Sequence, residues 1–190
     1  MKHLDIGSGP NPRNPNNCEE VYGLDQHTFD DPRISQFNLG IEKLPFPDNF
    51  FDSVSAFDLL EHIPRQSINH QTKKIVFPFV DLVQEVWRVL KPNGQFIALT
   101  PAYPAKQAFQ DPTHVNFITI DTHSYFCGNN KHVDRYGFYG DFEPISVRFV
   151  LPEEIYGDTS IRLKWRKFRY SLFKGGLTHI YWSLKAIKRV

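Results

Sequence analysis

Residues 3–25, HLDIGSGPNPRNPNNCEEVYGLD, decide the fold of this chain. Residues 4–6 predict a short buried strand, the Gly-Ser-Gly that follows predicts a tight turn, and residues 21–24 predict a second strand that ends on Asp25. A strand, a two-glycine turn and a second strand that closes on a carboxylate begin a doubly wound nucleotide-binding sheet. The glycines let the backbone approach a ligand closely, and the carboxylate can bind both hydroxyls of a ribose. The stretch therefore predicts a cofactor site.

The residues after the turn indicate which cofactor this site takes. A dinucleotide site has a third glycine and a helix whose N-terminus binds the pyrophosphate. Here residues 10–15 read PNPRNP, and no apolar residue follows at helical spacing before Val21. Without helix amides to bind phosphates, the ligand is expected to carry a ribose and no phosphate. S-adenosylmethionine fits this description better than NAD, FAD or ATP.

Length and composition predict one globular domain. The chain has 190 residues, of which 41% are hydrophobic and 15% aromatic, and its formal net charge is +1. A chain of this length can bury a proper core without disulfides or metals, so residues 1–190 are predicted to form a single domain. The small net charge argues against a protein that coats nucleic acid. Two cysteines without CxxC spacing, and the absence of a leader or membrane-spanning run, predict a cytoplasmic protein.

The first hundred residues predict alternating strands and helices. Short strands are expected around residues 34–39 and at residues 51–57, with residues 58–62 at the carboxyl end of the latter, where open α/β sheets bind ligands. Apolar residues between positions 76 and 90 recur every three or four residues, which predicts an amphipathic helix that ends before Pro92-Asn93-Gly94. Residues 95–99 predict the next strand. This alternation is typical of a mostly parallel sheet.

Beyond residue 101 the periodicity weakens. One short helix is expected at residues 121–126, and strands at 144–151 and 160–168 are expected to pair antiparallel and finish the sheet. Residues 170–190 are expected to form a basic C-terminal helix. Residues 1–101 would then be the cofactor-binding half, and residues 102–190 would supply the substrate loops, the terminal hairpin and that helix.

Four motifs resemble, in order and spacing, those of class I S-adenosylmethionine-dependent methyltransferases of the "type 11" domain. They are LDIGSGP, GLD, LPFPDNFFDSVSAFDLLEHIP and EVWRVLKPNGQFIALTP, which together cover residues 4–101. The DPTH stretch at residues 111–114 is similar to a subgroup found with bacterial or viral polysaccharide-biosynthesis genes. The resemblance implies a Rossmann-like methyltransferase sheet, with S-adenosylmethionine as cofactor.

The resemblance also implies which residues bind that cofactor. At the methionine and ribose end these are Asp5, Gly7, Ser8, Gly9, Asp25, Phe57 and Asp58, and at the adenine end they are Gln26, Asn38 and Leu39. Members of the family usually begin with helices that cap the site ahead of the first strand, and these cap helices are expected to be absent here. The helix after the glycine turn is shortened to a Pro/Asn loop. The cofactor is therefore expected to be more open than usual unless the C-terminal third or another subunit covers it.

A hydroxyl acceptor must lose its proton during methyl transfer, and a positioned His or carboxylate contributes about 10²–10⁴-fold to the rate. His114 is the predicted base, and Asp111 in the same DPTH stretch is predicted to orient its imidazole. The alternative, that Asp-x-x-His is an Asx-turn or a helix cap without a catalytic role, stays open. His62 is a third candidate, for which packing or capping is the favoured role.

A metal is the remaining alternative for this region. Asp111, His114 and His123 would offer ligands for a divalent ion beside a sugar diol, but they lack tight ligand spacing, and no metal site is predicted. The other histidines considered are taken as solvated or structural, namely His27, His70, His132 and His179.

The C-terminal segment is rich in basic and aromatic residues. Nine Lys and Arg residues and no Asp or Glu follow position 161, interleaved with aromatic residues such as Trp165 and Trp182. Such a segment could lie on an anionic membrane surface or bind phosphorylated partners. In the alternative interpretation the aromatic residues complete the core and the basic residues form a solvated face.

The sequence predicts an S-adenosylmethionine-dependent O-methyltransferase that acts on a sugar or glycan precursor. One alternative is a methyltransferase acting on a small metabolite or on RNA, although no RNA-binding motif supports the latter. Another is a non-catalytic module of the same fold that serves as a scaffold for a glycosyltransferase.

Overall fold

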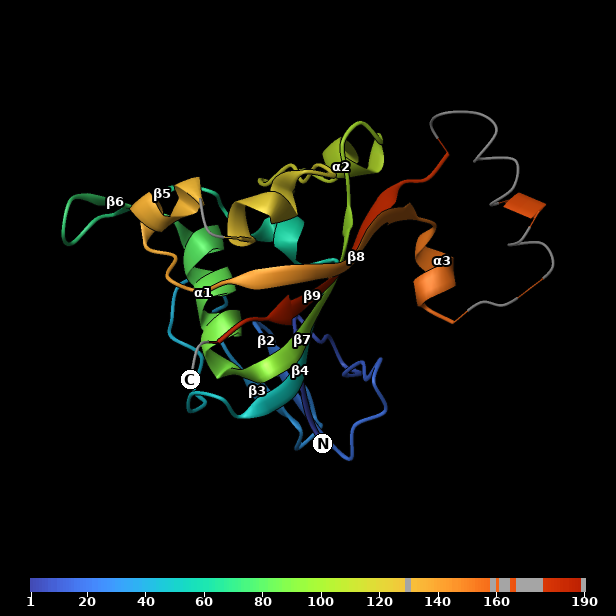
Figure 1. The fold of residues 1–190 in the computed structure, drawn as a ribbon, viewed down its shortest axis with the longest axis horizontal. Helices are drawn as coiled ribbons and strands as arrows, with labels where there is room; N and C mark the ends of the chain where they lie inside the picture. The colour runs from blue at the N-terminus through green and yellow to red at the C-terminus, as the bar shows by residue number, and fades with distance from the viewer. Residues whose placement is uncertain (129–130, 158–159, 161–164, 167–175, 189–190) are drawn as a thin grey trace.

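The computed structural model describes residues 1–128, 131–157, 160, 165–166 and 176–188. In this part of the chain seven strands form one sheet, in the order β3-β2-β1-β4-β7-β9-β8 (Figure 1). The strands are β1 (Lys2–Ile6), β2 (Glu20–Asp25), β3 (Ile34–Gln36), β4 (Phe51–Phe57), β7 (Leu90–Pro101), β8 (Phe142–Val150) and β9 (His179–Ala186). The first five strands in this order, from β3 through β2, β1 and β4 to β7, are parallel, and β9 is antiparallel to both of its neighbours. The predicted mostly parallel sheet with an antiparallel pair is confirmed. Its chain order reverses between β1 and β4, the point at which open sheets bind ligands.

The remaining elements are short, apart from one helix. They are η1 (Leu60–His62), β5 (Ser67–Asn69), β6 (Lys74–Val76), α1 (Pro78–Val89), α2 (Gln107–Gln110), η2 (Thr122–Phe126), η3 (His132–Tyr136) and α3 (Pro152–Ile155). Strands β5 and β6 form an antiparallel hairpin that projects away from the sheet (Figure 1). The helix α1 begins at Pro78, whose fixed φ suits a first turn, and ends where Leu90 becomes extended. The predicted helix is thus confirmed, although Val76 belongs to β6.

The main core lies between the sheet and α1. The buried residues of α1 recur at helical spacing and contact residues from β1, β4, β7 and β9 in one cluster. A smaller cluster, Phe57, Ile97, Leu99 and Val150, is packed by Ile155 and Tyr181 and lies apart from it. The guanidinium of Arg13 lies over the Phe57 ring, at 5.4 Å from its centroid. The Pro/Asn loop at residues 10–17 therefore lies near this second cluster, in place of a helix.

Hydrogen bonds hold this loop in place. The Arg13 amide donates to Asp5 Oδ2 at 2.8 Å, and Asn16 Nδ2 donates to Gln95 Oε1 at 2.8 Å. Close packing at Gly23 adds to this, because a Cβ at that position would lie 2.8 Å from Ser8 Oγ and 3.0 Å from Pro12. A side chain at position 23 would therefore push the loop and the glycine turn away from β2. The predicted replacement of a helix by a Pro/Asn loop is confirmed.

The predicted C-terminal helix at residues 170–190 is wrong where the structure describes it. Residues His179–Ala186 form β9, which is inserted between β7 and β8. The physical reason is that burial alternates along this segment with the period of two typical of a strand. The fully buried residues are Ile180, Trp182, Leu184 and Ala186. Trp182 is therefore a core residue, and the described part of this segment offers no basic aromatic helix for a membrane surface.

Two further strand predictions need correction. The strand at 144–151 is confirmed as β8, but its partner is β9 and not residues 160–168. Most of that predicted strand lies outside the described residues, and Trp165 and Arg166 are helical. The strand expected at 34–39 is limited to β3, and the one expected at 95–99 extends over all of β7.

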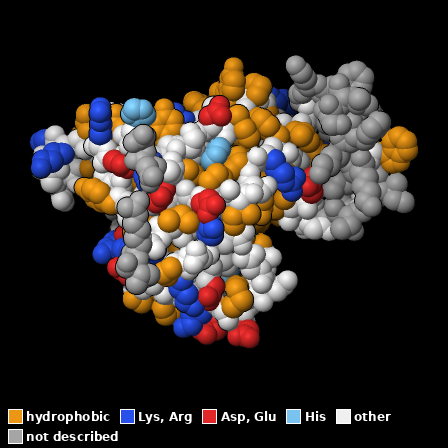
Figure 2. Space-filling model, viewed as in Figure 1, with side chains coloured by type: hydrophobic (Ala, Val, Ile, Leu, Met, Phe, Trp, Pro, Cys, Tyr) orange, Lys and Arg blue, Asp and Glu red, His pale blue; other side chains and the backbone are white. Residues whose placement is uncertain are grey.

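Charge is spread over the described surface. Figure 2 shows Lys and Arg side chains interspersed with Asp and Glu on the face in view, without a continuous basic patch among the described residues. No described helix has both the length and the apolar character needed to cross a membrane.

The burial of Trp182 generates a first prediction. Trp182→Ala is expected to lower the free energy of unfolding by about 3–5 kcal/mol, because it leaves a large cavity in the main core. Trp182→Phe is expected to cost less, because it keeps a ring and removes an indole N–H that is buried without a partner among the described residues. Urea unfolding followed by circular dichroism measures both. Tyr139→Ala, at an exposed position, is the control. A Trp182→Ala protein as stable as this control would contradict the assignment of β9 to the core.

Candidate functional site

The glycine turn after β1 is held against the end of β2. Gly7 has a φ of +70°, and its amide donates to the Leu24 carbonyl at 2.8 Å. The Gly9 amide donates to Asp25 Oδ2 and the His27 amide donates to Asp25 Oδ1, both at 2.9 Å. A Cβ on Gly7 would lie 3.0 Å from the Leu59 side chain, so the backbone itself forms the wall here. The turn and the carboxylate therefore face the same space.

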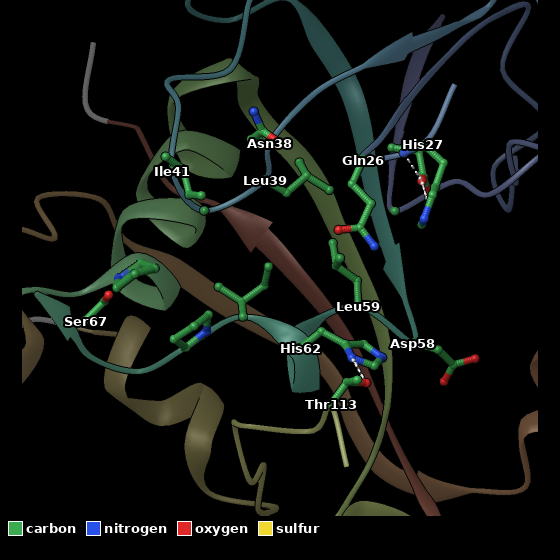
Figure 3. Close-up of a pocket in the computed structure, with 16 residues that line it drawn as sticks. Gln26, His27, Asn38, Leu39, Ile41, Asp58, Leu59, His62, Ser67 and Thr113 are labelled. Atoms are coloured by element: carbon green, nitrogen blue, oxygen red, sulfur yellow. Dashed lines mark hydrogen bonds and ion pairs between the residues drawn. The ribbon is translucent and has the colours of Figure 1, made fainter. Parts of the chain in front are cut away.

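That space is a cavity of about 680 Å³. Predicted cofactor residues on its wall are Gly7, Asp25, Gln26, Asn38, Leu39 and Asp58. The wall also includes Leu59 and His62 of the segment after β4, which are labelled in Figure 3. The volume is that of a ligand site for a medium-sized organic molecule. The backbone at Gly7 and the carboxylate of Asp25 provide what a nucleoside needs, and the described residues 10–17 after the glycine turn form a loop and not a helix that could offer amides to a phosphate. The residues present fit S-adenosylmethionine.

Four predicted cofactor residues lie behind this wall. Asp5 is fully buried and binds Ser55 and the Arg13 amide, and Ser8 Oγ donates to the Gly9 carbonyl. Gly9 contributes its amide to Asp25, and Phe57 packs in the second hydrophobic cluster. The structure thus places Asp5, Ser8, Gly9 and Phe57 as supports of the cavity.

A buried polar ladder lies beneath the turn. Ser55 Oγ donates to Asp5 Oδ1 at 2.5 Å, so its oxygen accepts from His3 Nε2 at 2.9 Å, and His3 Nδ1 accepts from Ser53 Oγ at 2.7 Å. Burial lowers the pKa of His3 to about 4, because the cation would lose its hydration. Burial also raises the pKa of Asp5 to about 6, although the hydrogen bond from Ser55 opposes this. His3 is therefore neutral at pH 7.

A second cavity, of about 290 Å³, adjoins the first. Asp58 and His62 line both cavities. The second is otherwise lined by Glu61, Pro101, Gln107, Gln110, Asp111, His114 and His179. All three predicted catalytic residues, His62, Asp111 and His114, are therefore brought together here, beside the cofactor cavity.

The Asp111–His114 segment forms an Asx-turn. Asp111 Oδ1 accepts from the Thr113 amide at 2.8 Å and from Thr113 Oγ1 at 2.6 Å. His114 Nε2 lies 3.9 Å from Asp111 Oδ2, whereas His114 Nδ1 lies 3.2 Å from the Ala108 carbonyl oxygen. The carbonyl, more than Asp111, orients this imidazole. Both ends of this Asx-turn, Asp111 and His114, line the second cavity. The turn therefore does not exclude a catalytic role for His114.

His62 belongs to the same group of side chains. Its Nδ1 lies 3.0 Å from Thr113 Oγ1, as the dashed line in Figure 3 marks, and its ring contacts His114 edge to face with centroids 4.8 Å apart. His62 is the last residue of η1, and its side chain lines both cavities.

Glu61 is a site residue that the sequence reasoning missed. Its side chain lines the second cavity, is 1% exposed, and accepts from Thr100 Oγ1 at 2.9 Å. Burial raises its pKa to about 8. A carboxyl group kept from water beside two imidazoles is typical of a functional site. The signal in the sequence is an acidic residue between Leu60 and a histidine, in the stretch DLLEHI at the end of a predicted strand.

Asp58 has an unusual backbone and a dense set of partners. Its φ is +51°, the Tyr156 hydroxyl donates to its Oδ2, and His179 Nε2 lies 3.5 Å from its Oδ1. Burial opposes ionisation, but the bonds from His179 and Tyr156 outweigh it and lower the pKa of Asp58. His179, taken from the sequence as solvated or structural, therefore contributes to the site. His27, also taken as solvated or structural, lines the first cavity, where its Nδ1 lies 3.2 Å from Asp25 Oδ1.

His123 does not join the other candidate metal ligands. Its Nδ1 donates to the Ile120 carbonyl, and its ring contacts Trp182. Among the described residues, the close group of potential ligand atoms consists of Glu61, His62 and His114. The ligand set weighed from the sequence, with His123, is therefore wrong.

Comparisons with known proteins agree with this geometry. Solved structures with the same fold include a SAM-dependent methyltransferase from Archaeoglobus fulgidus, at a TM-score of 0.58 and 15% identity, covering 97% of this chain and 85% of that one. The [4+2]-cyclase SpnF has a TM-score of 0.57 and 16% identity over 99% of this chain and 75% of its own. The site and sheet define the class I S-adenosylmethionine-dependent methyltransferase fold.

The family follows from the sequence match. A family model described as a methyltransferase domain matches residues 4–98, half of the chain, so the chain belongs to this methyltransferase-domain family, whose cofactor is S-adenosylmethionine. A curated relative, the ubiquinone/menaquinone biosynthesis C-methyltransferase UbiE of Stutzerimonas stutzeri, is 34% identical over 95 residues. That match spans 44% of this chain and 32% of UbiE.

The buried ladder predicts a pH dependence of stability. The pKa of His3 is lower in the folded state, so the unfolded chain binds more protons as the pH falls from about 6.5 to about 4, and stability is lost over that window at up to about 1.4 kcal/mol per pH unit. Asp5 acts in the opposite sense, since its raised pKa favours folding at lower pH. Asp5 is present both in wild type and in a His3→Gln variant, so a comparison of these two proteins isolates the effect of His3.

The measurement is urea unfolding of wild type and His3→Gln at several pH values between 4.5 and 7. The stability difference between them is expected to shift against wild type as the pH falls. His132→Gln, at an exposed site, should follow wild type. A difference independent of pH would contradict the buried neutral imidazole.

The position of Asp25 predicts an effect on cofactor affinity. Asp25→Asn removes the charge that would accept from ribose hydroxyls and replaces an acceptor of the Gly9 amide, so affinity for S-adenosylmethionine should fall by about 10–100-fold. Isothermal titration calorimetry measures it. Asp30→Asn, exposed and away from the cavity wall, is the matched control. Equal affinities would remove Asp25 from the cofactor site.

Proposed function

We propose that this chain transfers the methyl group of S-adenosylmethionine to a hydroxyl of a small polyhydroxylated acceptor, a sugar or glycan precursor, with His114 as the general base. The observation that carries the proposal is the pair of adjoining cavities with Asp58 and His62 in their common wall. The first has the size and lining for the cofactor. The second collects the groups that can take a proton from an acceptor.

The hydrogen bonds of His114 support its role as base. A carbonyl oxygen only accepts, so Nδ1 must carry the hydrogen that faces Ala108, and in the neutral imidazole Nε2 keeps a lone pair. Asp111, near that nitrogen, would stabilise the imidazolium that forms. When bound, the cofactor supplies a methyl group on a sulfonium, and alignment of the acceptor oxygen with it is the main requirement for transfer.

The lining of the second cavity favours a polar acceptor. Carboxyl, amide and imidazole groups from Asp58, Glu61, Gln107, Gln110 and His179 face it. Such a dense set of hydrogen-bonding groups suits the hydroxyls of a sugar better than an apolar ring.

Two alternatives have specific support. The name of the UbiE relative describes a C-methyltransferase of quinone biosynthesis, which favours a small aromatic acceptor methylated on carbon. The likeness to a [4+2]-cyclase supports the second alternative, in which this fold serves a reaction other than methyl transfer. One fold can carry different sites, and function depends on the site. Incubation with S-adenosylmethionine and a panel of nucleotide sugars, glycans and hydroxylated quinone analogues, followed by mass spectrometry, separates these alternatives. A methylated sugar supports the proposal, and methylation of the quinone analogues alone would replace it.

The base assignment gives the next prediction. His114→Asn is expected to reduce turnover by about 10²–10⁴-fold and to leave the affinity for S-adenosylmethionine unchanged, because the imidazole lies in the second cavity only. Steady-state kinetics and calorimetry measure the two quantities. His70→Asn, an exposed residue beyond β5, is the control. Turnover equal to wild type would end the assignment.

A further inference from the structure

We propose that Glu61, His62 and His114 bind a divalent transition-metal ion in the second cavity. One potential ligand atom from each of these residues lies within 4.8 Å of the other two. The residues come from separate parts of the chain, since Glu61 and His62 belong to η1 and His114 follows α2. Their convergence is therefore a property of the fold and not of local sequence.

The hydrogen bonds prepare both imidazoles as ligands. Thr113 has one hydroxyl hydrogen, which it donates to Asp111, so its oxygen must accept from His62 Nδ1. The Ala108 carbonyl accepts from His114 Nδ1 in the same way. Both neutral imidazoles thus carry their hydrogen on Nδ1 and keep the Nε2 lone pair for an ion. A histidine that binds a metal almost always donates its other N–H to such an outer partner.

The third ligand is held equally firmly. Thr100 Oγ1 donates to Glu61 Oε2, which fixes the orientation of the carboxyl group. The Glu61 carbonyl oxygen accepts from the amides of Val115 and Asn116, both at 2.9 Å. These two bonds attach the segment that carries His114 directly to η1. The ligands therefore keep their separation without needing the ion.

The charges and donor atoms select the kind of ion. Asp58 and Asp111 face this cavity and give it a negative field, to which Glu61 would add its charge once an ion displaces its proton. Two imidazole nitrogens and one carboxylate oxygen suit Zn²⁺, Mn²⁺ or Fe²⁺, whereas Mg²⁺ and Ca²⁺ prefer oxygen ligands alone. Three protein ligands leave coordination positions open, as in catalytic metal sites and unlike the closed four-ligand structural sites.

The open positions would take acceptor hydroxyls. This part of the inference rests on the proposed function and changes the role of His114 within it. An ion bound to an acceptor hydroxyl lowers the pKa of that hydroxyl, so His114 would act as a ligand and the proton would pass to Asp111, whose Oδ2 lies 3.9 Å from His114 Nε2. A pair of neighbouring hydroxyls, as in a sugar diol, could occupy two positions at once.

Metal binding is tested on the full chain without cofactor or acceptor. The protein is dialysed against a chelator and titrated with Zn²⁺ and with Mn²⁺ by calorimetry, and with Co²⁺ by visible absorption. One ion per chain is expected. Glu61→Gln, His62→Ala and His114→Ala should each weaken binding by more than about tenfold, since loss of an outer partner alone costs that much. His70→Ala, at an exposed site, is the matched control, and circular dichroism confirms that each variant is folded.

The outcomes separate the metal site from the proposed reaction. Absence of saturable binding, or binding that survives two of the three substitutions, overturns the inference. A sugar methylated at the same rate with and without chelator overturns the catalytic part and leaves the proposed function intact. Stoichiometric binding lost in all three variants, with no methylated sugar in the panel, supports the metal site and refutes the proposed function.

Discussion

The hydrogen bond from the Gly9 amide to the Asp25 carboxylate is the constraint on which the cofactor cavity depends. It joins the turn after β1 to the last residue of β2, so the two strand ends that border the cavity keep a fixed separation. Only a backbone that tolerates a positive φ at Gly7 and Gly9 can make this connection without strain. The carboxylate that holds the turn is also the one predicted to bind a ribose, so the same group would both build the site and bind the ligand.

A second connection of the same kind places the acceptor side. The Glu61 carbonyl receives two amide hydrogen bonds from the segment after the DPTH turn. The Asn116 side chain adds a bond to the Leu60 carbonyl and accepts one from Arg65 Nε. Backbone contacts thus set the distance between η1 and this segment, while the side chains of Glu61, His62 and His114 remain directed at the cavity between them. The chemistry of the second cavity rests on main-chain geometry that the motif residues alone do not specify.

How far the sequence predicts this protein differs between its two halves. Strands β1, β2 and β4, the helix α1 and the carboxylate at the end of β2 follow from local apolar patterns and glycines, and these patterns are dense up to residue 101. His62, Asp111 and His114 were predicted as candidates one by one, whereas their convergence in one cavity depends on contacts between distant segments. Glu61 was missed because its burial depends on Thr100 and on the segment after His114, which are distant in sequence. The strand β9 was missed because the basic residues around it suggested a surface helix, although its buried residues alternate with a period of two.

The glycine at position 23 links three segments that no single motif includes. A Cβ there would meet Ser8 of the turn, Pro12 of the loop and Ile34 of β3, each at 3.0 Å or less. Exchange of the glycine itself displaces all three together. A side chain at residue 23 is therefore compatible with this fold only if the turn, the loop and β3 all change with it.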